Sequence, residues 1–408
     1  MTDFLPNARD ARAALLPLVS GELDDERARR LLAVHAWSCL IEPGDAIAGR
    51  LVSTMGHEEA LAAAVAGRSP TAALDAAGIT SRTWQEALKR WLPRVNERAM
   101  RDALDVARRS GVSLLTPEDP QWPASLADLG DHAPLLLWVR GDLGRLSDPT
   151  PTVALVGARA STSYGEHVTM EIAAELVARG VAIVSGAAYG IDGAAHRAVL
   201  TAGGTTVAIL AGGADRPYPS GHAHLIDGVA QSGAVVSEVP CGSAPTKWRF
   251  LQRNRLIAAL ADVTVVVEAG WRSGSLNTAG HAAALGRALG AVPGPVTSPA
   301  SAGCHRLMRE FDAQCVTSAD DVVELLGGPT PTLFDMPPVQ GPGERTDDVT
   351  RVTDAMSFRA PRETSDIARR AGLTPEEVTA ILGLLTLDGS VIRAEGGWRR
   401  GRTGVPVP

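Results

Sequence analysis

The chain is poor in cysteine, with 4 residues in 408, and no two of them form a CxxC pair. They stand apart as Cys39, Cys241, Cys304 and Cys315. Isolated cysteines exclude a dense disulfide framework and the ligand spacing of a zinc site. They suit a reducing compartment, so the sequence predicts a cytoplasmic protein.

Long apolar runs are also missing. No run approaches the roughly 20 apolar residues that a helix needs to cross a bilayer. Residues 1–25 carry charges of both signs ahead of a short apolar run, which is unlike a secretory signal. We therefore expect neither a cleaved leader nor contact with a membrane.

The sequence also lacks an excess of positive charge. The sequence has 39 Lys and Arg against 46 Asp and Glu, a formal net charge of -7. Any basic binding site must therefore arise from local clustering. A composition of 45% hydrophobic and 21% charged residues is ordinary for a globular protein, and 408 residues suffice for two or three domains.

Residues 1–110 are predicted to form a helical N-terminal domain. The stretch DERARRLLAVHAWSCL places apolar residues at i, i+3 and i+4. That spacing gives a helix one apolar face. The helices are interrupted at EPGD, where proline and glycine indicate a turn.

Residues 111–327 are predicted to form the central domain. Apolar runs that are rich in β-branched residues and too short for helices alternate there with helical segments. The runs are 152–157, 181–186, 205–213, 234–239 and 262–270. Strands that are apolar on both faces indicate a parallel sheet covered by helices on both sides. The predicted fold class is α/β, with a Rossmann-like, doubly wound, mainly parallel sheet.

The C-terminal part of the chain divides into a linker and a small module. Residues 328–347 are rich in proline and glycine and are predicted to be a linker. Residues 348–408 are predicted to form three helices and a hairpin that turns at Gly396-Gly397, the plan of a winged-helix-like domain. The third helix has a capping box formed by Thr374 and Glu377.

Basic, small and hydroxyl residues follow the strands of the predicted sheet. In a doubly wound sheet, ligands bind outside the carboxyl ends of the strands, and glycines at helix N-termini expose N–H groups that bind phosphate. The candidate binding residues are Arg159, Ser185, Gly186, Tyr189, Gly190, Lys247, Arg249, Arg253, Arg255, Arg272, Ser273 and Ser275.

A single arginine at the end of a loop is more often solvated or paired with a carboxylate, and Glu268 and Asp192 are available as partners. Five arginines after strands of one sheet favour a groove for several phosphates, which is typical of a polynucleotide backbone. Trp248 and Trp271 flank the basic residues. Each either stacks on a base or belongs to the core.

Catalytic motifs are missing from the sequence. The first strand is followed by GARASTSYG, not by the GxGxxG of a dinucleotide site. A GxSxG elbow, paired acids in a catalytic context and a metal-ligand cluster of His, Cys and carboxylates are equally absent. The sequence therefore predicts no catalytic residue, no cofactor and no metal.

Several segments occur in a fixed order along the central region. They are GARASTSYG, VSGAAYGIDGAAHRAVLTAGGTTVAILAGGADRPYPSGH, FLQRNRLIAALADVTVVVEAGWRSGSLNTA, AVPG and SPASAGCHRLM. Together they closely resemble the DprA/Smf (DNA-processing protein A) family over Val112 to Gly327. An ordered series of matches over some two hundred residues is far more specific than one motif.

The resemblance implies a Rossmann-like core that binds single-stranded DNA, and a homodimer formed through that domain. It implies a role without catalysis, in which the protein protects incoming single strands during natural transformation and loads the RecA recombinase onto them. By motif match, Arg159 stands for the family's phosphate-contacting arginine. The other matched positions are Lys247, Arg249, Arg253, Asn254 and Arg255 in its basic segment, and Arg272, Ser273, Gly274 and Ser275 in its RSGS motif.

The chain departs from the family pattern at several positions. Ala158 replaces the usual Ser before the arginine, and Leu251 replaces a Pro in the basic segment. Tyr189 stands where a cation often precedes Gly-Ile-Asp, which removes one charge but offers a ring for stacking. Many members have a SAM-like or helix-hairpin-helix N-terminal domain. Residues 1–110 lack the hairpin motif, so DNA binding there is not expected.

Two alternatives come from other classes of protein. Rossmann-like phosphoribohydrolases process nucleotides, but Thr278 stands where their catalytic Glu would be, and glycosidic hydrolysis needs an acidic group. The winged-helix-like module could instead bind a partner protein, because Glu376 and Glu377 begin the helix that would meet DNA phosphates.

Overall fold

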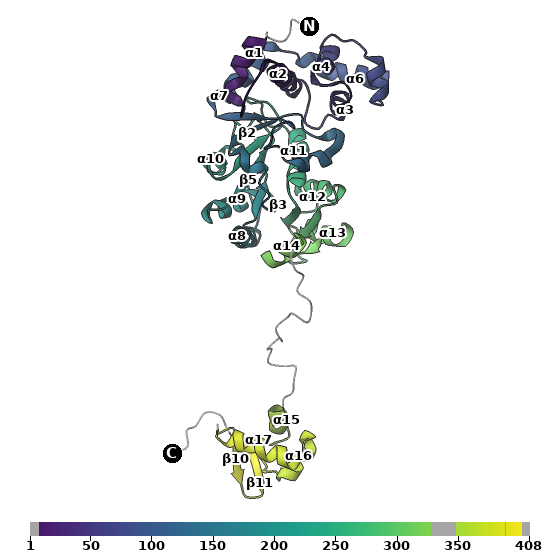
Figure 1. Cartoon of the computed structure of the whole chain (residues 1–408). Helices are drawn as coiled ribbons and strands as arrows, with labels where there is room; N and C mark the ends of the chain where they lie inside the picture. Colours follow the sequence, from purple (N-terminus) through teal and green to yellow (C-terminus); the bar gives the residue numbers. More distant parts are fainter. Residues whose placement is uncertain (1–7, 328–347, 388, 402–408) are drawn as a thin grey trace. The chain divides into compact units, whose positions relative to one another are not determined.

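A computed structural model describes residues 8–327, 348–387 and 389–401. The predicted linker 328–347 therefore lies outside the described residues. By its internal contacts the chain divides into two compact units, Met1–Thr330 and Pro331–Pro408 (Figure 1).

A nine-stranded sheet forms the centre of the first unit, in the order β1-β2-β6-β5-β4-β3-β7-β8-β9. Its strands are β1 (Val112–Leu115), β2 (Leu137–Gly141), β3 (Thr152–Gly157), β4 (Ala182–Ser185), β5 (Thr206–Leu210), β6 (Ala234–Ser237), β7 (Val263–Glu268), β8 (Ala288–Ala291) and β9 (Gln314–Cys315). The seven strands β6, β5, β4, β3, β7, β8 and β9 run parallel, whereas β2 pairs antiparallel with both β6 and β1 at one edge. The predicted mainly parallel, Rossmann-like α/β sheet is confirmed.

The strand order reverses at β3. From β3 the chain winds outward through β4, β5 and β6, and then returns to place β7 on the other side of β3. The connection after β3 and the connection after β7 leave the sheet in opposite directions. The carboxyl ends of these two strands therefore lie on either side of a crevice. The pairing register also shifts between Val156 and Gly157, where β3 meets Glu268 of β7.

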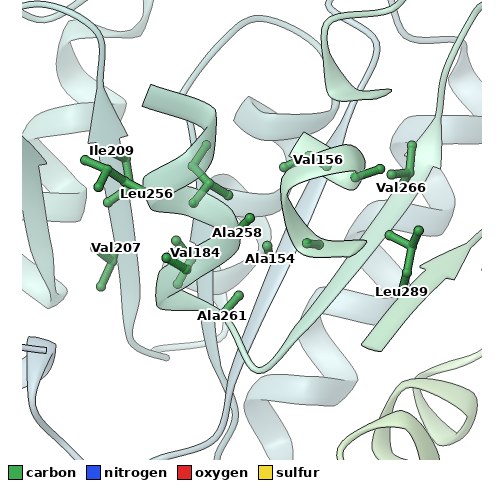
Figure 2. Close-up of a cluster of buried hydrophobic side chains, with 14 of the residues drawn as sticks. Ala154, Val156, Val184, Val207, Ile209, Leu256, Ala258, Ala261, Val266 and Leu289 are labelled. Carbon is green, nitrogen blue, oxygen red and sulfur yellow. The ribbon is translucent and has the colours of Figure 1, made fainter. Parts of the chain in front are cut away.

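Helices cover both faces of the sheet, as continuous apolar strands require. One face packs against α11 (Lys247–Leu260), α12 (Ser275–Ala284) and α13 (Ala302–Glu310). The other packs against α8 (Ser163–Ala178), α9 (Ile191–Thr201), α10 (Ala223–Ser232) and α14 (Ala319–Leu325). Figure 2 shows Leu256 of α11 beside Ile209 in the first of these layers. Burying each large aliphatic side chain contributes about 1.5–3 kcal/mol, which holds α11 against the sheet.

The N-terminal helices share a core with the edge of the sheet. They are α1 (Ala8–Leu15), α2 (Asp25–Leu40), α3 (Ala46–Met55), α4 (His57–Val65), α5 (Thr71–Ala76), α6 (Ser81–Trp91) and α7 (Glu97–Arg109). Side chains of α1, α2 and α7 pack with Val112 and Trp138 of β1 and β2. A second cluster holds Trp37, Trp84 and Trp91, with Trp91 edge-on to both other rings at centroid distances of 5.2 and 5.8 Å.

The second unit contains α15 (Asp348–Asp354), α16 (Thr364–Ala371), α17 (Pro375–Leu387), β10 (Val391–Ala394) and β11 (Gly397–Arg400). The predicted capping box is present, since Glu377 N donates to Thr374 Oγ1 at 3.3 Å and Thr374 N donates to the Glu377 carboxylate at 2.9 Å. Gly397 pairs with Ala394, so the hairpin turns one residue earlier than predicted. None of the helices in the described ranges combines the length and apolar character needed to cross a bilayer.

Candidate nucleic-acid interface

A cleft of about 900 Å³ opens where the strand order reverses. Its lining comes from residues 157–160 at the end of β3, from α11, and from Gly270 and residues 272–275 after β7. Gly274 and Ser275 begin α12, so its N-terminus meets the cleft. The free N–H groups and the positive end of the helix dipole favour an anion there.

Four cationic side chains and one carboxylate line this cleft: Arg159, Lys247, Arg253, Arg272 and Asp192. Arg159, Lys247 and Arg272 are exposed to solvent, whereas Arg253 and Asp192 are buried. The cleft is therefore locally positive in a chain whose net charge is -7. Its several cations suit more than one phosphate of a polynucleotide backbone.

Arg253 forms the floor of the cleft. Its Nη1 donates to the carbonyl oxygens of Gly186 and Ile209 at 2.7 and 2.5 Å. Burial lowers the pKa of Arg253 to about 10, so the group stays charged at neutral pH. Burial also raises the pKa of Asp192, against the opposing fields of Arg253 and Arg159. The floor thus holds a buried guanidinium and a buried carboxyl group.

An aromatic platform accompanies the charges. The Arg159 guanidinium lies over the Phe250 ring at 4.6 Å and Arg253 at 5.7 Å, measured to the ring centroid. Tyr218 tilts against the same ring at 5.6 Å between centroids. Sequence reasoning missed Phe250 and Tyr218. The only available signal was the position of Phe250 between two arginines.

The RSGS segment is held against α11. Asn254 Nδ2 donates to Gly274 O and to Asn277 Oδ1, both at 3.2 Å. The hydroxyls of Ser273 and Ser275 share a hydrogen bond at 2.8 Å. These bonds hold a hydroxyl pair next to Arg272 in the cleft lining.

Arg249 and Arg255 lie outside the cleft lining, although the sequence placed both on its wall. Arg249 makes a two-point ion pair with Glu42 of the N-terminal region, at 2.8 and 2.9 Å. Burial acts to raise the pKa of Glu42, but hydrogen bonds from Arg249 and Arg94 outweigh it and hold that pKa below its ordinary value. Arg255 is buried and paired with Glu238 at 2.6 and 2.7 Å. Both arginines therefore position α11.

The SGAAYG segment supports the cleft from behind. Ser185 is buried and donates to Leu155 O at 2.6 Å. Gly190 has φ +77°, and a methyl group there would overlap Ala158 O in the loop that carries Arg159. Tyr189 is exposed and lies edge-on to His222, at 4.8 Å between ring centroids. Within the described residues, then, this segment shapes the cleft but does not line it, apart from Ala188.

Gly186 is expected to tolerate no side chain. A methyl group at this position would overlap the Arg253 guanidinium, so Arg253 would have to move and give up its hydrogen bonds to two carbonyl oxygens. We expect Gly186→Ala to lower the unfolding free energy by about 1–3 kcal/mol in urea titrations. Gly280→Ala in α12 is the control, because a methyl group there meets nothing within 4 Å. Equal stability of the two variants would contradict the role of Gly186.

Comparison with known proteins places this geometry in a family. The model of the family described as DNA recombination-mediator protein A matches residues 113–327, and the model of the DprA winged helix domain matches residues 336–397. A Mycobacterium tuberculosis protein that carries the name DprA is 47% identical over 318 residues, 74% of this chain and 80% of that protein.

Two further relatives agree. The Escherichia coli protein Smf is 36% identical over 291 residues, which are 70% of this chain and 77% of Smf. The crystal structure of DNA processing protein A from Streptococcus pneumoniae superimposes with a TM-score of 0.57 at 30% identity, covering 72% of this chain and 97% of that one. The chain therefore belongs to the DNA recombination-mediator protein A (DprA/Smf) family.

Proposed function

We propose that this protein binds single-stranded DNA in the cleft and acts as a mediator of DNA recombination. The observation that carries the proposal is the cleft itself, in which Arg159, Lys247, Arg253 and Arg272 surround Phe250 and Tyr218. Cations along the path neutralise phosphates, and aromatic rings accept unstacked bases. A duplex keeps its bases paired inside, so this arrangement favours a single strand.

We further propose a role without catalysis. The one carboxylate in the cleft lining, Asp192, is buried, and no second Asp or Glu lines the cleft to complete the pair of acids that glycosidic hydrolysis uses. Thr278, at the position of the phosphoribohydrolase glutamate, is buried in the cleft wall. Among the described residues, no group of three or more His, Cys, Asp or Glu side chains is placed to hold a metal ion.

The remaining parts of the proposal rest on membership of the family. In a cytoplasmic setting, the protein would protect incoming strands during natural transformation and transfer them to the RecA recombinase. It would act as a homodimer through the Rossmann-like domain. We propose domain boundaries of 1–110, 111–327 and 348–408, with a linker at 328–347, and a partner-binding role for the winged-helix-like domain.

The proposal is tested by fluorescence anisotropy with a labelled oligo-dT strand and a matching duplex at several salt concentrations. We expect tighter binding to the single strand and a log–log salt slope of about -2 to -3, since each phosphate neutralised on a single strand contributes about -0.7. Equal binding to the duplex, or a flat salt dependence, would refute it. Release of free base from AMP would favour the phosphoribohydrolase instead.

A further inference from the structure

Three side chains form a second stack on the surface at α13. The Arg306 guanidinium lies over the Trp271 ring at 5.2 Å and over the Phe311 ring at 5.6 Å, measured to the centroids. Trp271 keeps 59% of its surface exposed and Phe311 keeps 41%. We call Trp271, Arg306 and Phe311 the Trp271 stack.

Core packing does not account for the Trp271 stack. An indole that is more than half exposed contributes little burial. Arg306 already has an acidic partner one turn away, because its Nε lies 2.7 Å from a Glu310 carboxylate oxygen. The guanidinium therefore does not need the rings to satisfy its charge. Large exposed aromatic surface with an adjacent cation is instead typical of a contact site for a ligand.

The Trp271 stack continues the cleft. Gly270 and Arg272, the two neighbours of Trp271, both line the cleft. Pro299 and Ala300 also line it and lead directly into α13, which carries Arg306. The indole thus stands at the rim, between the cleft and the outer surface of α13.

The chemistry of the rim repeats that of the cleft. In the cleft, Arg159 lies over Phe250, and at the rim Arg306 lies over Trp271. Aromatic faces alternating with guanidinium groups are suited to successive bases of a single strand, whose π-faces stack regardless of sequence. A protein partner would be expected to need an apolar area broader than this narrow row of rings.

We propose that the Trp271 stack is a base-stacking subsite for nucleotides that leave the cleft. This inference rests on the proposed binding of single-stranded DNA. The cleft holds the phosphates, and the stack holds the bases of the next nucleotides along the strand. The stack therefore contributes affinity only for a strand long enough to reach it.

The test compares oligo-dT strands of about 4 and about 16 nucleotides, the range that single-strand sites cover. We expect Trp271→Ala to weaken binding of the longer strand about tenfold, to leave the shorter strand unaffected and to leave the salt slope unchanged. Longer strands with abasic sites at either the 5′ or the 3′ end keep the phosphates but lose the bases. One of these two abasic strands should bind the wild-type protein about tenfold more weakly than the intact strand does. Trp271→Ala should not weaken the binding of that abasic strand any further.

Phe358→Ala is the matched control, because Phe358 is also exposed and lies under a guanidinium, that of Arg400 at 4.7 Å. It should leave the affinity for both strands unchanged. The subsite is refuted if Trp271→Ala leaves the affinity for the longer strand intact while Arg159→Ala weakens it, or if Trp271→Ala weakens both strands equally. Absence of any binding by wild type would refute the proposed function and the subsite together.

Discussion

Replacing Arg159 by Ala is expected to weaken oligo-dT binding at least about tenfold at low salt, because a hydrogen bond to a charged group is worth about 1.5–3 kcal/mol. Arg159 is exposed, lines the cleft and lies over Phe250. Its guanidinium lies over the ring and keeps an exposed side that can meet a phosphate. The log–log salt slope should fall in magnitude by about 0.7, the contribution of one phosphate on a single strand. Anisotropy titrations at several salt concentrations measure both quantities.

Arg98→Ala is the control for the loss of one positive charge. Arg98 lies on α7, its side chain is 91% exposed, and its distance to Asp102 is 3.9 Å. This variant should bind like wild type with an unchanged slope. Arg159→Ala should lose the same factor of affinity for oligo-dT as for strands of mixed sequence, because phosphate contacts carry no sequence information. A normal slope and affinity in Arg159→Ala would remove Arg159 from the site.

Replacing Arg255 by Met is expected to cost about 3–5 kcal/mol of unfolding free energy, the penalty for leaving one partner of a buried ion pair alone. The side chains of Arg255 and Glu238 are only 3% and 10% exposed. Arg255 also donates to His132 O at 2.8 and 3.0 Å, so it joins α11 to the segment between β1 and β2. Urea titration followed by circular dichroism measures the loss.

The double variant Arg255→Met with Glu238→Leu tests the cause. Replacing both charges by apolar groups of similar volume is often neutral, so the double variant should regain most of the lost stability. Failure to recover would show that packing of the arginine stem, and not the unpaired carboxylate, sets the cost. Stability of Arg255→Met equal to wild type would contradict the burial of the pair.

The fold was predictable because its signal is local. Runs of β-branched residues separated by helical periodicity indicate a parallel sheet wherever they occur, and β3, β4, β5, β6 and β7 lie within the predicted runs. The ends of strands were less well predicted. The run 205–213 continues past Leu210, because Ala211 to Gly213 are buried in the loop after β5 and look like strand from composition alone.

The sequence was enough to predict that arginines line the site, but not which of the arginines do so. Arg159, Arg253 and Arg272 line the cleft, as their positions after strands suggested. Arg249 does not, because Glu42 lies 207 positions earlier in the chain and pairs with it only in the folded protein. Phe250 and Tyr218 meet across 32 residues, and no periodicity in the sequence relates them.

The sequence by itself determined the α/β class, the location of the basic segments and the resemblance to a DNA-processing family, because each depends on residues close together in the chain. Only the tertiary structure decided which cations are free. The fold pairs Arg249 with Glu42, whereas it leaves Arg159 exposed in the cleft lining over Phe250, where it can meet a phosphate. Whether an arginine is paired depends on how distant segments pack in the folded protein, so the residue type alone does not predict it.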